Sequence, residues 1–135
     1  MANEITIIEL LGNQGDPISY TCAEGTTIEK GTLLELEDPR TCKKVSGAGV
    51  VLAGVAAMEK VAGDGSTTIS VLTNFIGEMK ISAGGTTVLG SGVRSAGADN
   101  TVTVATTLDN ETGKSIGRSL ETGANAELVS VKVQI

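Results

Sequence analysis

Gly113, Lys114 and Ser115 form the Gly-Lys-Ser sequence with which a phosphate-binding loop ends. Such a loop also needs a glycine five residues earlier, so that backbone N–H groups can curl around the phosphates, and a helix must follow it. Leu108 occupies that earlier position, and glycines interrupt the sequence after Ser115. We therefore predict that Lys114 is a solvated loop lysine at the start of a strand and that it binds no nucleotide.

Other chemistry-bearing residues are few, because the 135 residues include no histidine. Ser/His/Asp and Cys/His arrangements and histidine-ligated metal sites therefore cannot be built. Two acidic groups remain, Asp109 with Glu111 and Glu35 with Glu37 and Asp38, and paired carboxylates can act as general acids and bases. Both groups lie in polar, turn-like stretches, where we expect solvated surface charges. We expect no catalytic residues, no bound metal or cofactor, and no enzymatic activity.

The two cysteines, Cys22 and Cys42, have neither Cys-x-x-Cys spacing nor a histidine to complete a zinc site. We expect free, partly buried thiols, and a disulfide between them is the alternative. The N-terminal sequence has a short apolar run without a basic region before it, and no segment has the length of a membrane span. These features predict a protein that is made in the cytoplasm and works there or in a larger assembly, away from membranes.

The composition predicts an all-β fold. Val, Ile, Leu and Ala must fill the core, since the chain has one Tyr, one Phe and no Trp, and the 18 glycines and abundant Thr favour short strands joined by tight turns. A chain of this length is one domain by the usual relation of size to domain number. The net charge of −6 and the scarcity of aromatic residues argue against a nucleic-acid partner.

Alternation of apolar and polar residues marks the strands. The clearest lies at residues 127–135, where Val129, Val131, Val133 and Ile135 share one face. Further strands are expected at 5–10, 18–22, 32–37, 50–56, 67–73, 75–81 and 101–106. The glycine-rich residues 83–100 are expected to form a loop or a weak strand.

An internal repeat divides the chain. Residues 25–33, GTTIEKGTL, are echoed by residues 85–93, GTTVLGSGV, and residues 52–73 are echoed by residues 115–134, with Gly117 matching Gly54 and Val131 matching Val71. The repeat predicts two β-meander halves, residues 25–73 and 85–135, which close a small β-barrel or sandwich of antiparallel strands within one domain, residues 18–135. Chance similarity of Gly/Thr/Val-rich segments is the alternative. Residues 1–17 are expected to form a separate N-terminal strand or arm.

The order of motifs resembles the head decoration, or cement, proteins of tailed viruses such as bacteriophages. The resemblance rests on GTTIEKGTLLEL, VLAGVA, GDGSTTISVLT, GEMKISAGGTTV, TGKSIGRSLETG and ELVSVKVQI, and it covers residues 18–135. It implies an all-β structural protein of the virion that binds the major capsid protein on the capsid exterior, commonly as a homotrimer, and stabilises the shell after assembly in the host cytoplasm. A tail or baseplate β-module of the same kind of virus is an alternative that the sequence does not separate from it.

Two further hypotheses concern particular residues. The sequence GEMKIS resembles the Met-Lys hairpin of biotinyl and lipoyl carrier domains, which would make Lys80 an attachment site, although the alternation of residues 75–81 places Lys80 within a strand. The N-terminal apolar run is more apolar than one strand face can bury, so we predict that it contributes to an interface. The residues of this run are Ile5, Ile7, Ile8, Leu10 and Leu11.

Overall fold

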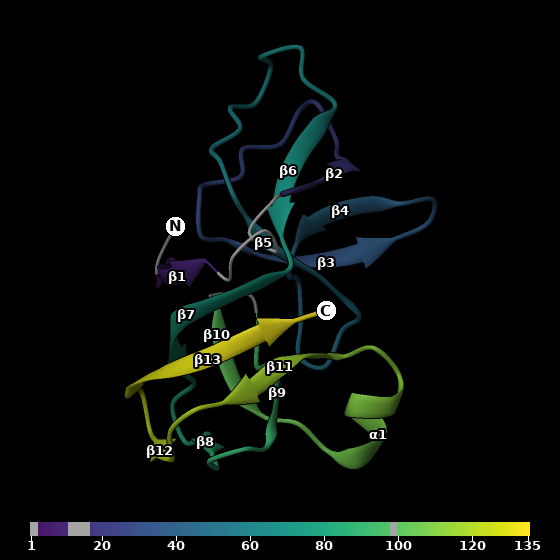
Figure 1. Cartoon of the computed structure of the whole chain (residues 1–135). Helices are drawn as coiled ribbons and strands as arrows, with labels where there is room; N and C mark the ends of the chain where they lie inside the picture. The colour runs from purple at the N-terminus through teal and green to yellow at the C-terminus, as the bar shows by residue number, and fades with distance from the viewer. Residues whose placement is uncertain (1–2, 11–16, 98–99) are drawn as a thin grey trace.

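The computed structural model describes residues 3–10, 17–97 and 100–135, and it is built almost wholly of β-strands (Figure 1). The predicted all-β barrel fold is confirmed. The prediction of antiparallel meanders that together close one barrel was wrong, since there are two closed barrels and each contains one parallel strand pair. The strands are β1 (Thr6–Leu10), β2 (Ile18–Thr21), β3 (Leu33–Glu37), β4 (Thr41–Lys44), β5 (Leu52–Ala56), β6 (Thr68–Leu72), β7 (Asn74–Ile81), β8 (Thr86–Thr87), β9 (Gly92–Ser95), β10 (Thr101–Val104), β11 (Ser115–Ser119), β12 (Gly123–Ala124) and β13 (Leu128–Gln134). One short helix, α1 (Thr107–Glu111), precedes β11.

The first barrel closes in the strand order β2-β4-β3-β5-β6. Neighbouring strands are antiparallel except β2 and β4, which run parallel and pair at Thr21 and Thr41. The interior is filled by a cluster of mostly small side chains, which includes both cysteines. Members of this cluster are Cys22, Ile28, Leu34, Cys42, Ala53, Ala56, Ile69 and Val71.

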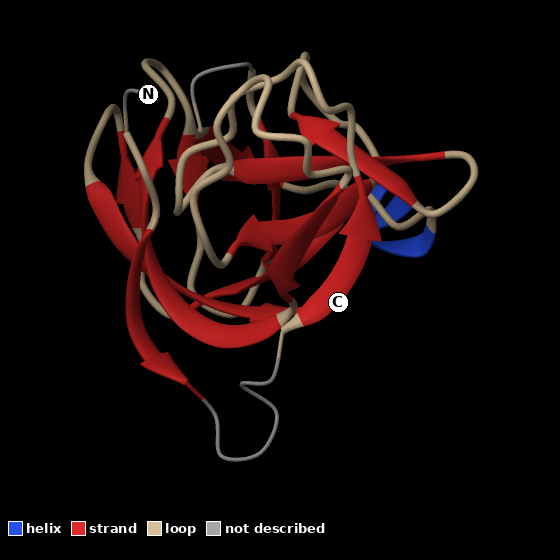
Figure 2. Cartoon of the chain, turned by 90° about the horizontal axis from the view of Figure 1, so that it is seen from above, coloured by secondary structure: helices blue, strands red, loops and turns tan. Residues whose placement is uncertain are grey.

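The second barrel has the order β7-β10-β9-β11-β13, and it closes because β13 also pairs with β7. Its one parallel pair is β7 with β10, so each barrel places its first strand beside its third in parallel. Strand β1 adds to β7 as an antiparallel edge strand, with a bulge between Ile7 and Glu9. In Figure 1 the first barrel lies above the second, and in the view of Figure 2 the long strands curve around the molecule.

The barrels are structural repeats. In each one the strand pairing shifts by one residue at the same place, between β3 and β5 and between β9 and β11. Equivalent positions are Leu34 and Val93, Glu35 and Arg94, Gly54 and Gly117, and Val71 and Val131. Gly31 corresponds to Gly90, because both glycines end the turn before the second strand of their barrel. The sequence repeat of residues 25–33 and 85–93 is therefore shifted by one residue from the structural alignment at this place.

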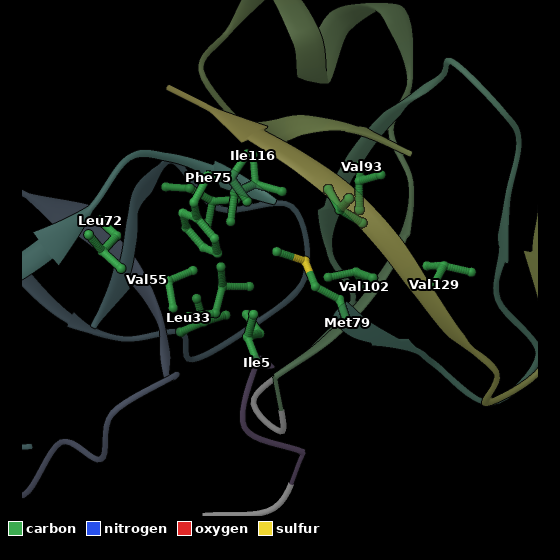
Figure 3. Packing of buried hydrophobic residues seen from close by; sticks show 14 of the residues in the cluster. Ile5, Leu33, Val55, Leu72, Phe75, Met79, Val93, Val102, Ile116 and Val129 are labelled. Atoms are coloured by element: carbon green, nitrogen blue, oxygen red, sulfur yellow. The ribbon is translucent and has the colours of Figure 1, made fainter. Parts of the chain in front are cut away.

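Both barrels share a single large core. The outward faces of β3, β5 and β6 pack onto the second barrel, so that Leu33, Val55 and Leu72 lie close to Phe75 and Ile116 (Figure 3). Strand β5 is therefore buried along its whole length. A buried hydrogen bond of 2.9 Å from the Leu33 N–H to Asn100 Oδ1 joins the barrels at the same place.

Strand β4 lies in none of the expected strands, and two other segments are more regular than the sequence-based expectation of a loop or weak strand at 83–100 and a turn at 107–111. Residues 83–100 contain the strands β8 and β9. Residues 107–111 form α1, because Thr106 caps the helix: its hydroxyl accepts from the Asp109 N–H while the Asp109 carboxylate accepts from the Thr106 N–H.

Candidate interaction surfaces

The Gly-Lys-Ser segment lies between α1 and β11. The Lys114 N–H donates to the Asp109 carbonyl at 3.0 Å, and β11 begins at the next residue. The helix therefore precedes the lysine, whereas a phosphate-binding loop requires a helix after it. The prediction that Lys114 leads into a strand is confirmed, although its side chain is half-buried, not fully solvated.

The expectation of solvated carboxylates was wrong for Asp109. Its side chain turns back to cap α1, where it is buried, and it forms an ion pair of 3.3 Å with Arg94 Nη1. The hydrogen bonds from Thr106 lower the pKa of Asp109 below its ordinary value, and the Arg94 charge adds to this effect. Glu111, on the same helix, is exposed as expected.

Glu35 is likewise buried, at the position that Arg94 occupies in the second barrel. Its carboxylate accepts from both the N–H and the hydroxyl of Ser46 at 3.0 Å and lies 3.2 Å from Lys43 Nζ. Burial raises the pKa of Glu35, but these hydrogen bonds outweigh it and hold the pKa below its ordinary value. Glu37 is exposed, paired with Lys43 at 2.9 Å, and Asp38 is exposed too. Glu35 thus holds the residues that follow β4 in place, and the arrangement does not resemble an acid-base pair.

Cys22 and Cys42 are free and buried. They follow the parallel pair Thr21 and Thr41 and point into the first barrel. Burial raises the pKa of the Cys42 thiol to about 11, and it raises that of Cys22 as well. Both side chains therefore act as small apolar core residues.

The predicted N-terminal interface residues divide between core and surface. Ile5 is buried in the shared core, and Ile7 packs against it. Ile8 forms the bulge of β1 and remains 52% exposed. Leu10 ends β1, and Leu11 lies outside the described residues. The interface stays a prediction, and Ile8 is the member of the run that is available to a partner.

A shallow depression on the second barrel was not found from the sequence. It is lined by Gly117, Arg118, Lys132 and Gln134. Arg118 and Lys132 face each other directly across β11 and β13, and in the described part of the chain neither makes an ion pair. Like charges in such a pair repel, which favours an anionic group as a partner.

The repeat contains the signal that would have revealed this depression. The equivalents of Arg118 and Lys132 in the first barrel are Val55 and Leu72, which are buried against the second barrel. A face that is apolar and covered in one half is therefore cationic and exposed in the other.

Lys80 lies within β7, between Leu128 of β13 and Thr101 of β10, as the alternation predicts. In the described residues, no group of three or more Cys, Asp or Glu side chains could hold a metal ion. Within those same ranges, no helix has the length and apolarity needed to cross a bilayer.

Comparison with known proteins finds a solved structure with a similar fold. No protein-family model matches the sequence, and no curated protein matches it. Among solved structures, the chain is similar to the head fiber gp8.5 N base in bacteriophage phi29, with a TM-score of 0.51 and 16% sequence identity, over 87% of this chain and 94% of that one. At this identity the likeness shows a shared fold.

Proposed function

We propose that this chain is a structural protein of a tailed virus particle, which binds the outer surface of the capsid shell and stabilises it. The observation that carries the proposal is the shared fold with a bacteriophage head-fiber base, which extends over 94% of the length of that chain. The sequence resemblance to head decoration proteins is a separate argument for the same role, since it rests on turn and strand motifs.

The physical character of the chain suits this role. With a net charge of −6 it is repelled by packaged DNA, and repeated weak contacts on a symmetric shell add together without any one of them being strong. The partners we propose are the major capsid protein and further copies of this chain, as a homotrimer.

Binding to capsids tests the proposal. Purified protein is added to capsids that lack it, the capsids are pelleted, and the bound protein is quantified and located by electron microscopy. We expect saturable binding at about three copies for each three-fold position of the shell, with density on the head. Tails without heads serve as the control. Failure to pellet with capsids would refute the proposal, and binding to tails alone would favour the tail or baseplate alternative.

The carrier-domain alternative has less support, because Lys80 is paired on both sides within a strand and no turn presents it. Its test is the intact mass of the protein from its native producer, where a lysine adduct would revive it.

A further inference from the structure

Four large apolar side chains are exposed at the end of the second barrel that carries β8 and β12, the lower end in Figure 1. They are Val88, Leu89, Leu120 and Leu128, with exposures of 50%, 66%, 37% and 58%. We name this group the apolar tip. An exposed group of large apolar residues on a small protein is typical of an interaction site.

Hydrogen bonds donated by backbone N–H groups bring the members of the apolar tip together. The Leu89 N–H donates to Thr122 Oγ1 at 3.1 Å, and the adjacent Gly90 N–H donates to the Ser119 carbonyl at 2.8 Å. The Leu120 N–H donates to the Ser130 carbonyl at 2.8 Å, which places Leu120 diagonally from Leu128 on the outer face.

The first barrel supplies an internal comparison. Its equivalents of the apolar tip are Glu29, Lys30, Ala57 and Thr68. None of these is a large apolar residue, although the backbone hydrogen bonds that hold the two ends are the same. The fold therefore does not require apolar side chains at these positions.

The two ends also differ in what covers them. In the first barrel the Ile5 N–H donates to the Gly31 carbonyl at 2.8 Å, and Ile5 lies so close that a Cβ on Gly31 would meet its carbonyl oxygen at 2.7 Å. At the equivalent Gly90, a Cβ would meet no atom within 4 Å. Glu4 and Ile5 thus occupy one end of the repeat, and none of the described residues occupies the equivalent place beside Gly90.

Charge defines the chemistry of the missing partner. Residues 82–91 and 119–129 contain two carboxylates, Glu121 and Glu127, and no Lys or Arg, while Lys80 of β7 pairs with Leu128 of β13. Both carboxylates are on exposed residues beside the apolar tip. A complementary partner is therefore an apolar segment flanked by basic residues.

We propose that the apolar tip docks an extended apolar segment of the capsid shell protein, flanked by Lys or Arg, at the place that the chain's own residues 4–5 occupy on the first barrel. This inference rests on the proposed function, and it names the surface that performs it. The partner segment would lie against the Gly90 turn and extend beyond it over Leu89 and Val88, further than residues 4–5 reach on the first barrel, where Lys30 is exposed. Its basic residues would lie beside Glu121 and Glu127.

The test exchanges residues between the two halves. The double variant Val88→Glu/Leu89→Lys gives the second barrel the residues of the first, so it should fold, which circular dichroism and thermal melting verify. We expect it to bind capsids at least about tenfold more weakly, since two large apolar side chains lose their burial. The matched control is Met58→Glu/Val61→Lys, at positions 50% and 55% exposed on the first barrel, which should bind as the parent does.

The outcomes separate this inference from the proposed function. If the parent binds capsids and the apolar-tip variant binds equally well, the inference falls and the proposed function stands. If the parent does not bind, both fall. If sedimentation shows that the parent associates with itself and only the apolar-tip variant is monomeric, the occupant is a second copy and docking of a shell segment is overturned. A photo-crosslinking residue at position 89 should attach to a basic, apolar segment of the shell protein.

Discussion

At the scale of single residues, buried charges hold the turns of this protein in place. Lys60 is only 3% exposed, and its Nζ donates to the carbonyls of Glu24 and Thr26 at 2.8 and 3.1 Å while Asp64 lies 3.5 Å away. One lysine thus donates to two carbonyls of the turn after β2, and the Glu24 carbonyl also accepts from the Gly63 N–H at 3.1 Å.

We expect Lys60→Met to lower the free energy of unfolding by about 1–3 kcal/mol, because those carbonyls lose a charged donor while the aliphatic part of the side chain is retained. Urea unfolding followed by circular dichroism measures the change. Lys30→Met, at an exposed lysine, is the control and should differ from the parent by less than about 0.5 kcal/mol. Equal stability of the two variants would contradict the role given to Lys60.

Glu35 makes the stability depend on pH. Its pKa is lower in the folded protein than in the unfolded chain, so its contribution is present above the unfolded pKa of about 4.3 and is lost as the pH falls through the lower folded value. We expect Glu35→Gln to destabilise the protein by about 1 kcal/mol at pH 7 and by less at pH 3. Urea midpoints at both pH values measure this, with the exposed Glu111→Gln as control. A deficit that is the same at both pH values would show that the charge of Glu35 contributes nothing.

At the scale of elements, the matching bulges depend on glycine. Gly117 has a φ of 155°, and a Cβ there would clash with the Lys132 carbonyl oxygen. Gly54 has a φ of 144°, and a Cβ there would meet the Leu72 carbonyl oxygen at 2.5 Å. Strand β11 therefore approaches β13 closely, and β5 approaches β6 closely, only because the glycine has no side chain.

Gly117→Ala should destabilise the second barrel by at least about 2 kcal/mol, since either β11 or β13 must move. Thermal unfolding measures the loss. Gly25→Ala is the control, because a Cβ at Gly25 meets nothing within 4 Å. If Gly117→Ala unfolds at the same temperature as the parent, then β11 and β13 can move apart to admit the Cβ at little cost, and the prediction is wrong.

The strands were predictable because alternation reports one buried face, as it does along β7 and β13. Alternation located β6 but did not reveal that its second face is buried: Leu72 points away from its own barrel and is covered by the other barrel. The burial of Glu35 and Asp109 was not predicted, because the sequence around a carboxylate in a polar turn does not show whether the side chain faces water or a backbone N–H. The apolar tip and the cationic depression appear only when the two halves are superposed.

At the scale of the whole molecule, the proposed trimer can be tested at Ile8. Ile8→Asp changes an exposed side chain on an edge strand, so the monomer should keep its stability, whereas Ile7→Asp would disturb the core. If the N-terminal run forms the trimer contact, Ile8→Asp shifts the sedimentation of the parent from trimer to monomer. An exposed apolar residue elsewhere, Leu108→Asp, provides the comparison and should leave the association unchanged. A parent that sediments as a monomer both in solution and when released from capsids would exclude the trimer.

Strand β7 is paired with β1 along one edge and with β13 along the other, so the first and last strands of the chain border the same central strand. The first barrel can form from residues 18–72 as soon as they leave the ribosome, whereas the second must wait for residue 134. Until then β7 has one edge without its final partner, although β1 can already pair with the other edge. Such late, distant pairing slows folding and exposes strand edges during synthesis. Synthesis should therefore yield a half-finished intermediate whose first barrel is closed, and its lifetime sets the period in which nascent chains are able to aggregate.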